Sequence, residues 1–270
     1  MPDGTTRMPT YFISHGGGPW PWLEHRPGFD YGALRDSLAR MPGELPAPAV
    51  AVLCVSGHWE AAAFTVMTSA APTMYYDYYG FPEHTYRISY RAPGAPLLAG
   101  RVGELLGAAG IELREDGERG FDHGTFVPLA VMYPEADLPV VQLSIRADFD
   151  PEAHLALGRA LAPLRDEGVL VVGSGLSFHN LRALGPVAKE PSARFDEWLT
   201  GTVVDGSPAE RAGRLAAWEQ APFARFCHPR EDHLIPLLVA AGAAEEEAAV
   251  RTYHETGFAG GVTASSYRFG

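Results

Sequence analysis

Continuous apolar runs that end in glycine or polar residues are the main feature of the hydrophobic pattern. Three of them stand out: residues 11–14, 50–56 and 169–172. A strand buried on both faces is apolar along its whole length, because neither face meets water. We therefore predict central, mostly parallel strands at these three places. The runs lead into His15, into His58 and, through Gly173-Ser174-Gly175, into His179.

Apolar residues at helical spacing mark the segments between and after these runs. The predicted helices are residues 30–41, 96–110, 151–167, 193–204, 208–218 and 231–241. A further strand is predicted at residues 138–144, and the tail after Thr252 is expected to add one more strand or loop. Strands that alternate with helices in this way predict a single α/β domain over residues 1–270.

Two segments lack a regular period. Residues 72–96 are aromatic and interrupted by proline, and we place them as a loop near the pocket. Asp122-His123-Gly124 is assigned to a loop that precedes the apolar segment 127–132. His154 falls within a predicted amphipathic helix and is expected to be solvated.

Composition restricts the partners. The formal net charge is -12 and no basic stripe is present, which disfavours nucleic acid as a partner because phosphate binding needs clustered Lys and Arg. No apolar run reaches the roughly 18 residues that span a bilayer, so no membrane association is expected. The two cysteines form neither a disulfide framework nor a metal motif, and the chain is expected to be cytoplasmic.

The histidines at the ends of the predicted strands are the candidate chemical groups. The carboxyl ends of parallel strands meet at one edge of a sheet, where ligands of α/β proteins bind. His15, His58 and His179 are therefore expected to lie near one another, and His233 begins the last predicted helix. Since neutral imidazole is a good ligand for iron and zinc, the set indicates a metal site at this edge.

Two other functions stay open. His15-Gly16-Gly17-Gly18 is also typical of the oxyanion hole of some esterases, which would make the chain a serine acyl hydrolase. Such enzymes need Gly-x-Ser-x-Gly, and the nearest match in this sequence is the segment around Ser177. The chain order still permits a triad of Ser177 with Asp205 or Asp232 and His233 or His254. A metal-binding protein of the same fold without catalytic activity is the third possibility.

Several motifs occur in order along nearly the whole chain. They are Ile13-Ser14-His15-Gly16-Gly17, Val55-Ser56-Gly57-His58-Trp59, Tyr79-Gly80-Phe81-Pro82, Asp122-His123-Gly124, Met132-Tyr133-Pro134-Glu135-Ala136-Asp137, Gln142-Leu143-Ser144, Gly173-Ser174-Gly175, His179-Asn180-Leu181 and His233-Leu234-Ile235-Pro236-Leu237-Leu238. With these motifs the sequence resembles the class III extradiol ring-cleavage dioxygenases, and among them the 4,5-DOPA extradiol dioxygenase-like group.

The resemblance implies a non-haem Fe(II) centre, sometimes filled by zinc in isolated proteins, in one α/β domain with a mixed sheet. By this resemblance His15, His58 and His233 are metal ligands. His179 corresponds to an acid/base residue that is close enough to be a fourth ligand. His123 corresponds to a histidine just outside the ligand set that also acts in catalysis.

The resemblance further implies a catechol-type substrate and O2 as partners, with a ring-opened semialdehyde as product. Trp20 and Tyr79 are the candidate residues for contact with the aromatic ring, although the aromatic loop equally fits a cover over the core. The residues beside the pocket differ from many members, with Gly17-Gly18 in place of Ser-Pro and Gly57 in place of Ala. Glu231-Asp232 leaves open whether a carboxylate joins the metal.

Overall fold

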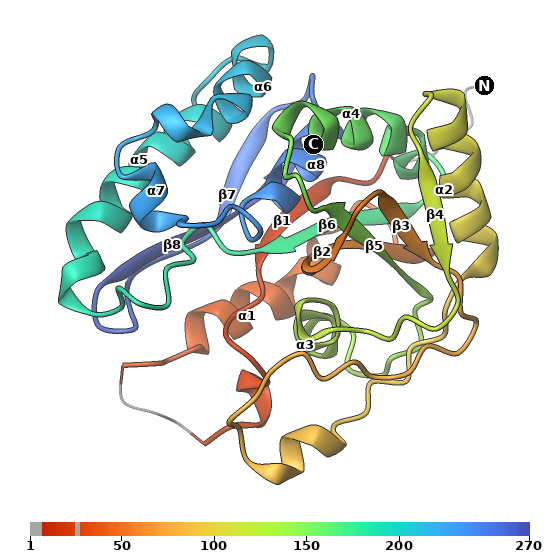
Figure 1. Cartoon of the computed structure of the whole chain (residues 1–270), viewed down its shortest axis with the longest axis horizontal. Helices are drawn as coiled ribbons and strands as arrows, with labels where there is room; N and C mark the ends of the chain where they lie inside the picture. Colours follow the sequence, from red (N-terminus) through yellow and green to blue (C-terminus); the bar gives the residue numbers. More distant parts are fainter. Residues whose placement is uncertain (1–6, 25–27) are drawn as a thin grey trace.

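One eight-stranded sheet runs through the computed structural model, which describes residues 7–24 and 28–270 (Figure 1). In chain order the strands are β1 (Thr10–Ser14), β2 (Ala51–Ala61), β3 (Phe64–Met67), β4 (Leu113–Asp116), β5 (Val140–Arg146), β6 (Val169–Gly175), β7 (Ala249–Phe258) and β8 (Val262–Phe269). Their order across the sheet is β4-β3-β5-β2-β6-β1-β8-β7.

The centre of the sheet is parallel, as the apolar runs predicted. β2 pairs in parallel with both β5 and β6, and β6 pairs in parallel with β1. β8 lies antiparallel to β1 and β7, and β3 is antiparallel to β5, so the sheet is mixed. The predicted α/β fold with a mixed, mostly parallel sheet is confirmed.

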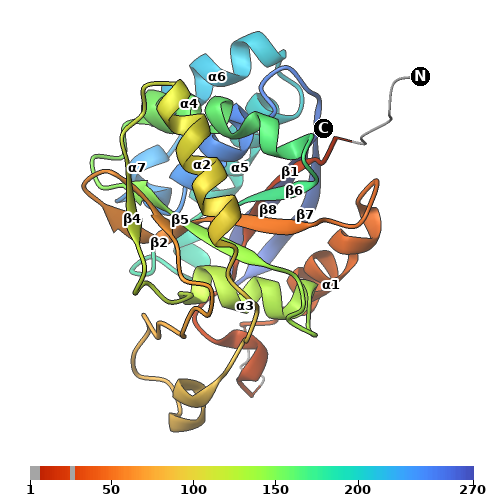
Figure 2. The same ribbon diagram turned by 90° about the vertical axis from the view of Figure 1, so that its right-hand side faces the viewer.

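Helices cover both faces of the sheet (Figure 2). They are α1 (Gly32–Arg40), α2 (Pro96–Ala108), α3 (His123–Met132), α4 (Pro151–Leu161), α5 (Lys189–Val203), α6 (Pro208–Ala216), α7 (Ala224–Cys227) and α8 (Ile235–Gly242). α1 and α3 pack on one face, against Tyr11 and Ile13 of β1. α5 and α8 pack on the other face, where Phe12 points, and α2 and α4 continue that layer. The alternation of buried side chains along β1 thus builds two cores.

The loop predicted at residues 122–124 is instead the start of α3. Asp122 caps this helix, because its side chain accepts a hydrogen bond from the Thr125 backbone N–H, and His123 is the first helical residue. The helix is buried on nearly all sides and contains Pro128, so its sequence shows no amphipathic period.

The prediction that His154 is solvated is wrong. The side chain is fully buried, donates from Nδ1 to the Asp150 carbonyl at 2.7 Å and accepts from the Arg146 backbone N–H at Nε2. Burial lowers the pKa of His154 to about 4, and the ring is therefore neutral at physiological pH.

The last third of the chain follows the predicted order with shifted limits. The helix predicted at residues 231–241 begins only at Ile235, because residues 232–234 form a turn in front of it. The tail after Thr252 supplies the rest of β7 and the whole of β8. None of the helices within residues 7–24 and 28–270 is long and apolar enough to cross a lipid bilayer.

Candidate metal centre

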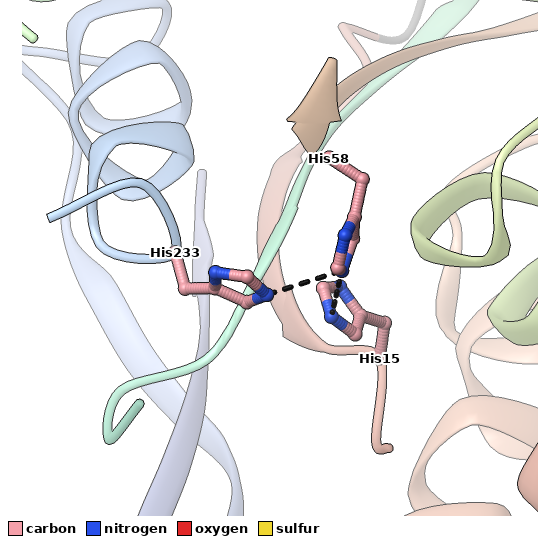
Figure 3. Close-up of side chains that lie close together, drawn as sticks. All are labelled: His15, His58 and His233. Carbon is pink, nitrogen blue, oxygen red and sulfur yellow. Dashed lines mark hydrogen bonds between the residues drawn. The ribbon is translucent and has the colours of Figure 1, made fainter. Parts of the chain in front are cut away.

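Three histidines converge at the carboxyl edge of the parallel strands (Figure 3). His15 directly follows β1, His58 lies in the second half of β2, and His233 stands two residues before α8. The Nε2 atom of His58 lies 3.1 Å from the Nε2 atoms of both His15 and His233. The structure thus brings the three predicted ligands together by their Nε2 atoms.

A break in the sheet ladder presents His58. The pairing of β2 with β5 slips between Ser56 and Glu60, so residues 57–59 leave the regular register. β2 continues to Ala61, past the end at Ser56 that the apolar run predicted. The irregularity turns the His58 side chain toward the other two histidines.

Glycines let the chain around His233 approach the sheet closely. A Cβ at Gly173 or Gly175 would overlap the carbonyl oxygens of Pro236 or His233, and a Cβ at Gly57 would lie 2.8 Å from the Asp232 oxygen. No other residue has a side chain small enough for this packing. The Gly173-Ser174-Gly175 motif therefore positions His233 by leaving room for its backbone.

Ser174 fixes the proton on the His15 ring. The Ser174 hydroxyl donates to the Gly124 carbonyl, so toward His15 it is an acceptor. His15 Nδ1 lies 3.0 Å from the Ser174 oxygen and carries the proton, which leaves a lone pair on Nε2.

A carboxylate faces Nδ1 of each of the other two rings. His58 Nδ1 lies 3.1 Å from Asp77 Oδ2, and His233 Nδ1 lies 2.9 Å from Asp232 Oδ2. A carboxylate can only accept, so His233 Nδ1 donates to Asp232, and the negative charge of Asp77 favours the proton of His58 on the nearby Nδ1; both Nε2 atoms then keep a lone pair. Acceptors on the far nitrogen are the usual support of metal-binding histidines.

Burial keeps these rings neutral. It lowers the pKa of His15 and His58 well below the ordinary histidine value, and the neighbouring histidines add to the effect. The pKa of His233 is lowered to about 4, again by burial first and by the adjacent His179 second. Neutral imidazole is the form that binds metals.

The donor set fits a metal ion. Two ligand atoms, each about 2.1 Å from a shared ion, are about 3.0 to 3.4 Å apart at octahedral to tetrahedral angles. The observed separation of 3.1 Å falls in that interval. Three neutral nitrogen donors suit iron or zinc and leave further coordination positions open.

Two more histidines flank the three. The His179 ring stacks on His233 with centroids 3.4 Å apart, and its Nδ1 lies 3.6 Å from Asp232 Oδ1. The His123 ring lies 3.9 Å from the His58 ring. Both predicted acid/base residues are therefore next to the candidate ligands.

Two carboxylates, Asp232 and Asp77, lie beside the candidate ligands. The sequence left open whether Glu231 or Asp232 belongs to the site. Asp232 faces the histidines, whereas Glu231 pairs with Arg225 at 2.5 Å. Burial raises the pKa of Asp232, but hydrogen bonds from the neighbouring histidines more than offset it and hold the pKa below its usual range. Asp77 was not singled out, because an acidic residue in an aperiodic loop carries no positional signal.

The predicted substrate residues lie in different places. Trp20 is buried, donates from its indole N–H to the His15 carbonyl at 2.8 Å and stacks on Tyr31. It thereby holds the glycine-rich loop after His15. Tyr79 is 91% exposed, outside the histidine cluster. Its neighbour Tyr78 is buried in the core, as the alternative for the aromatic loop predicted.

The residues of the hydrolase alternative do not form a triad. The Ser177 side chain is buried, and its hydroxyl accepts a hydrogen bond from the Ser265 backbone N–H. His254 contacts Ser265 and Asp196, and Asp205 is exposed. Ser177 is therefore oriented as a structural hydroxyl.

Comparison with protein families gives one match over most of the chain. The model described as "Catalytic LigB subunit of aromatic ring-opening dioxygenase" matches residues 31–270. This range contains His58, His123, His179 and His233, whereas His15 precedes it.

Individual relatives also match over most of the chain. The 4,5-DOPA dioxygenase extradiol of Beta vulgaris is 37% identical over 265 residues, which is 96% of each chain. The dioxygenase tasH of Hapsidospora irregularis is 39% identical over 92% of this chain and 83% of its own. The crystal structure of an uncharacterized protein from Escherichia coli K12 superposes with a TM-score of 0.79 at 31% identity, over 98% of this chain and 100% of that one.

Proposed function

This chain belongs to the family of the catalytic LigB subunit of aromatic ring-opening dioxygenases, and from that premise we propose that it opens a catechol ring with O2, using Fe(II). The observation that carries the proposal is the convergence of three imidazole Nε2 lone pairs, with two further histidines beside them. Extradiol cleavage needs a metal with open positions and groups that move protons; the three nitrogen donors support the first requirement and the two flanking histidines support the second.

His15, His58 and His233 would hold the metal ion through Nε2. A bound Fe(II) would supply the open positions at which a catechol and O2 meet and exchange electrons. Zinc suits the same donors, so it can fill the site in isolated protein without supporting the redox step. The acceptor groups beside the three Nδ1 atoms keep each lone pair aimed at one point.

His179 would accept the first proton. A general base must lie within hydrogen-bond reach of the group that it deprotonates, and stacking on His233 places His179 directly beside a ligand. Its Nδ1 faces Asp232, which leaves Nε2 for a catechol hydroxyl. The nearby carboxylate stabilises the imidazolium that this transfer creates.

His123 would return a proton as the ring opens. Its Nδ1 donates to Asp77 at 2.9 Å, which leaves its Nε2 for the substrate. Overall, the bond between one hydroxyl-bearing carbon and its unsubstituted neighbour breaks, and both atoms of O2 enter the product. The product is a carboxylate and an aldehyde on an opened chain, and no external reductant is needed.

The substrate would be a catechol with a side chain. Support comes from the relatives, several of which are 4,5-DOPA dioxygenases by name. Trp20 and Tyr79 stay predicted substrate contacts. The exposure of Tyr79 leaves its ring available to a substituent that projects from the site.

Oxygen uptake tests the proposed function. The protein is loaded anaerobically with Fe(II), and O2 consumption and the visible spectrum are recorded with DOPA, caffeate, protocatechuate and alkyl catechols. We expect one O2 per catechol and a new yellow chromophore, with neither in His58→Ala. No uptake across the panel by protein shown to hold iron would overturn the proposal in favour of a metal-binding protein without this activity.

A further inference from the structure

Asp77 occupies a firmly held position in the aromatic loop. The tyrosines on either side are fastened by their hydroxyls: Tyr76 donates to the Ile88 carbonyl and Tyr78 to the Thr85 carbonyl, each at 2.6 Å. Both acceptors lie in the same loop, so the loop is closed on itself around Asp77. The aromatic residues therefore serve to fix one carboxylate.

The loop is also tied to the segment that leads into α3. The Tyr75 backbone N–H donates to the Phe121 carbonyl at 2.8 Å, and the Phe121 N–H donates to the Thr73 carbonyl at 2.9 Å. The Arg119 guanidinium lies over the Tyr75 ring at 4.2 Å and pairs with Asp122, the cap of α3. These contacts fix the distance between Asp77 and the first turn of α3.

The Asp77 carboxylate accepts two hydrogen bonds from His123 and lies close to Nδ1 of His58. Oδ1 accepts from the His123 backbone N–H at 3.0 Å, and Oδ2 accepts from His123 Nδ1 at 2.9 Å. Oδ2 also lies 3.1 Å from His58 Nδ1. The side chain of Asp77 is only 10% exposed, so these bonds are made largely away from water.

One oxygen thus acts on the proton positions of two rings. Oδ2 holds the proton of His123 on Nδ1 through a hydrogen bond, and its negative charge favours the proton of His58 on the nearby Nδ1, which leaves both Nε2 atoms free. For His58 the free atom faces the other candidate ligands. For His123 it is the atom available for proton transfer.

On the basis of the proposed function, we propose that Asp77 is a positioning residue that fixes the tautomer and orientation of both His58 and His123. The same carboxylate thereby sets the metal ligand and the proton-transfer residue in fixed relation to each other. Its loss affects metal affinity through His58 and the chemical step through His123.

Ring tautomers in the unaltered protein give the first test. Histidines are labelled with ¹⁵N, and two-bond nitrogen–proton correlations are recorded on metal-free protein at neutral pH. We expect the Nδ1–H tautomer for His58 and His123. An Nε2–H tautomer at either ring would overturn the proposal, and this measurement needs neither turnover nor a variant that folds.

Asp77→Asn gives the second test. Asp77 uses both oxygens, Oδ1 for the His123 backbone N–H and Oδ2 toward the two Nδ1 atoms. An amide has one oxygen, so its NH2 group must face an N–H at the other position. Loss of such a partner typically costs 10-fold to 100-fold in metal affinity or activity. We expect at least a tenfold weaker affinity for Zn(II), measured by competition with a chromophoric chelator, and one ion per chain in the unaltered protein.

Turnover separates the two effects. At saturating Fe(II), Asp77→Asn is expected to lower kcat about tenfold or more with little change in KM, and Asp77→Glu is expected to recover part of it. In a His123→Ala background the same change should still weaken metal binding and no longer alter kcat. Glu83→Gln, which removes an exposed charge from the same loop, is the matched control and should behave as the unaltered protein.

The possible outcomes are distinct. A metal affinity of Asp77→Asn within twofold of that of the unaltered protein would overturn the proposal. Two ions per chain, one of them lost in Asp77→Asn, would also overturn it and make Asp77 a ligand. If the unaltered protein opens no catechol, the proposed function fails, while the tautomers and Zn(II) affinities still decide the role of Asp77.

Discussion

A methyl group added at Gly57 is expected to disturb the metal centre from the sheet side. Gly57 precedes His58, and the backbone of Asp232 and His233 passes directly over it. A Cβ at this position would lie 2.8 Å from the Asp232 carbonyl oxygen and 3.5 Å from the His233 Cα. The added methyl group is therefore expected to displace His58 and His233 relative to each other.

The size of the effect follows from the distances. An ordinary contact between Cβ and oxygen begins at 3.4 Å, so the Asp232 backbone must retreat by about 0.6 Å. Metal ligands tolerate errors of only about 0.2 Å. We expect Gly57→Ala to weaken Zn(II) binding by roughly tenfold and to cost about 1 to 3 kcal/mol of stability from overpacking.

Gly100→Ala is the matched control. Gly100 lies in α2, and a Cβ there meets no atom within 4 Å, so the change should stabilise the protein by about 0.5 to 1 kcal/mol. Thermal melts of metal-free protein and chelator competition measure both quantities. Equal metal affinity and equal melting temperature for the two variants would refute the reasoning about close packing at Gly57.

Three further predictions follow from the site and the core. His179→Ala should keep its metal and lose turnover, since the residue flanks the ligands; full ring cleavage by this variant, measured as O2 uptake, would remove His179 from the mechanism. Ser177→Ala should retain turnover, and a chelator should abolish that turnover, because the Ser177 hydroxyl accepts a structural hydrogen bond from the Ser265 backbone N–H. Loss of activity in this variant, together with activity of the unaltered protein that chelators do not change, would favour the hydrolase. The folded-state pKa of His154 is about 4 and the unfolded value about 6.5, so the unfolded chain binds the extra proton and metal-free protein should lose stability as pH falls from about 6.5 to 4. Melting temperatures across this interval should fall less steeply in His154→Gln, and an unchanged slope would contradict the assignment.

The apolar pattern predicted the sheet well because its central strands are buried on both faces. Continuous apolar runs predicted β1, β2 and β6, and their parallel arrangement predicted that His15, His58 and His179 lie at one edge; β5 was predicted as a further strand. The short outer strands β3 and β4 were not found. β4 is only four residues long, with two exposed residues between two partly exposed ones, so it shows no strand period.

The parts of the site that the sequence did not reveal depend on tertiary contacts. α3 has no polar face, since the sheet and the aromatic loop bury it, so no helical period marks its start at His123. Asp77 gains its place from bonds between the loop and α3, which no local pattern encodes. The sequence shows Gly173 and Gly175 in β6, but not why glycine is needed there: the backbone of His233 and Pro236, about sixty positions later, packs against them.

The central claim is that this chain uses a metal held by His15, His58 and His233 to insert both atoms of O2 into a catechol. The most direct measurement is mass spectrometry of the product formed by the Fe(II)-loaded protein under ¹⁸O2, with the aldehyde reduced in the reaction to prevent exchange with water. The account predicts one ¹⁸O in the carboxylate and one in the trapped alcohol, and no product from His58→Ala. Absence of ¹⁸O from the product, or its entry only from labelled water, would contradict the account.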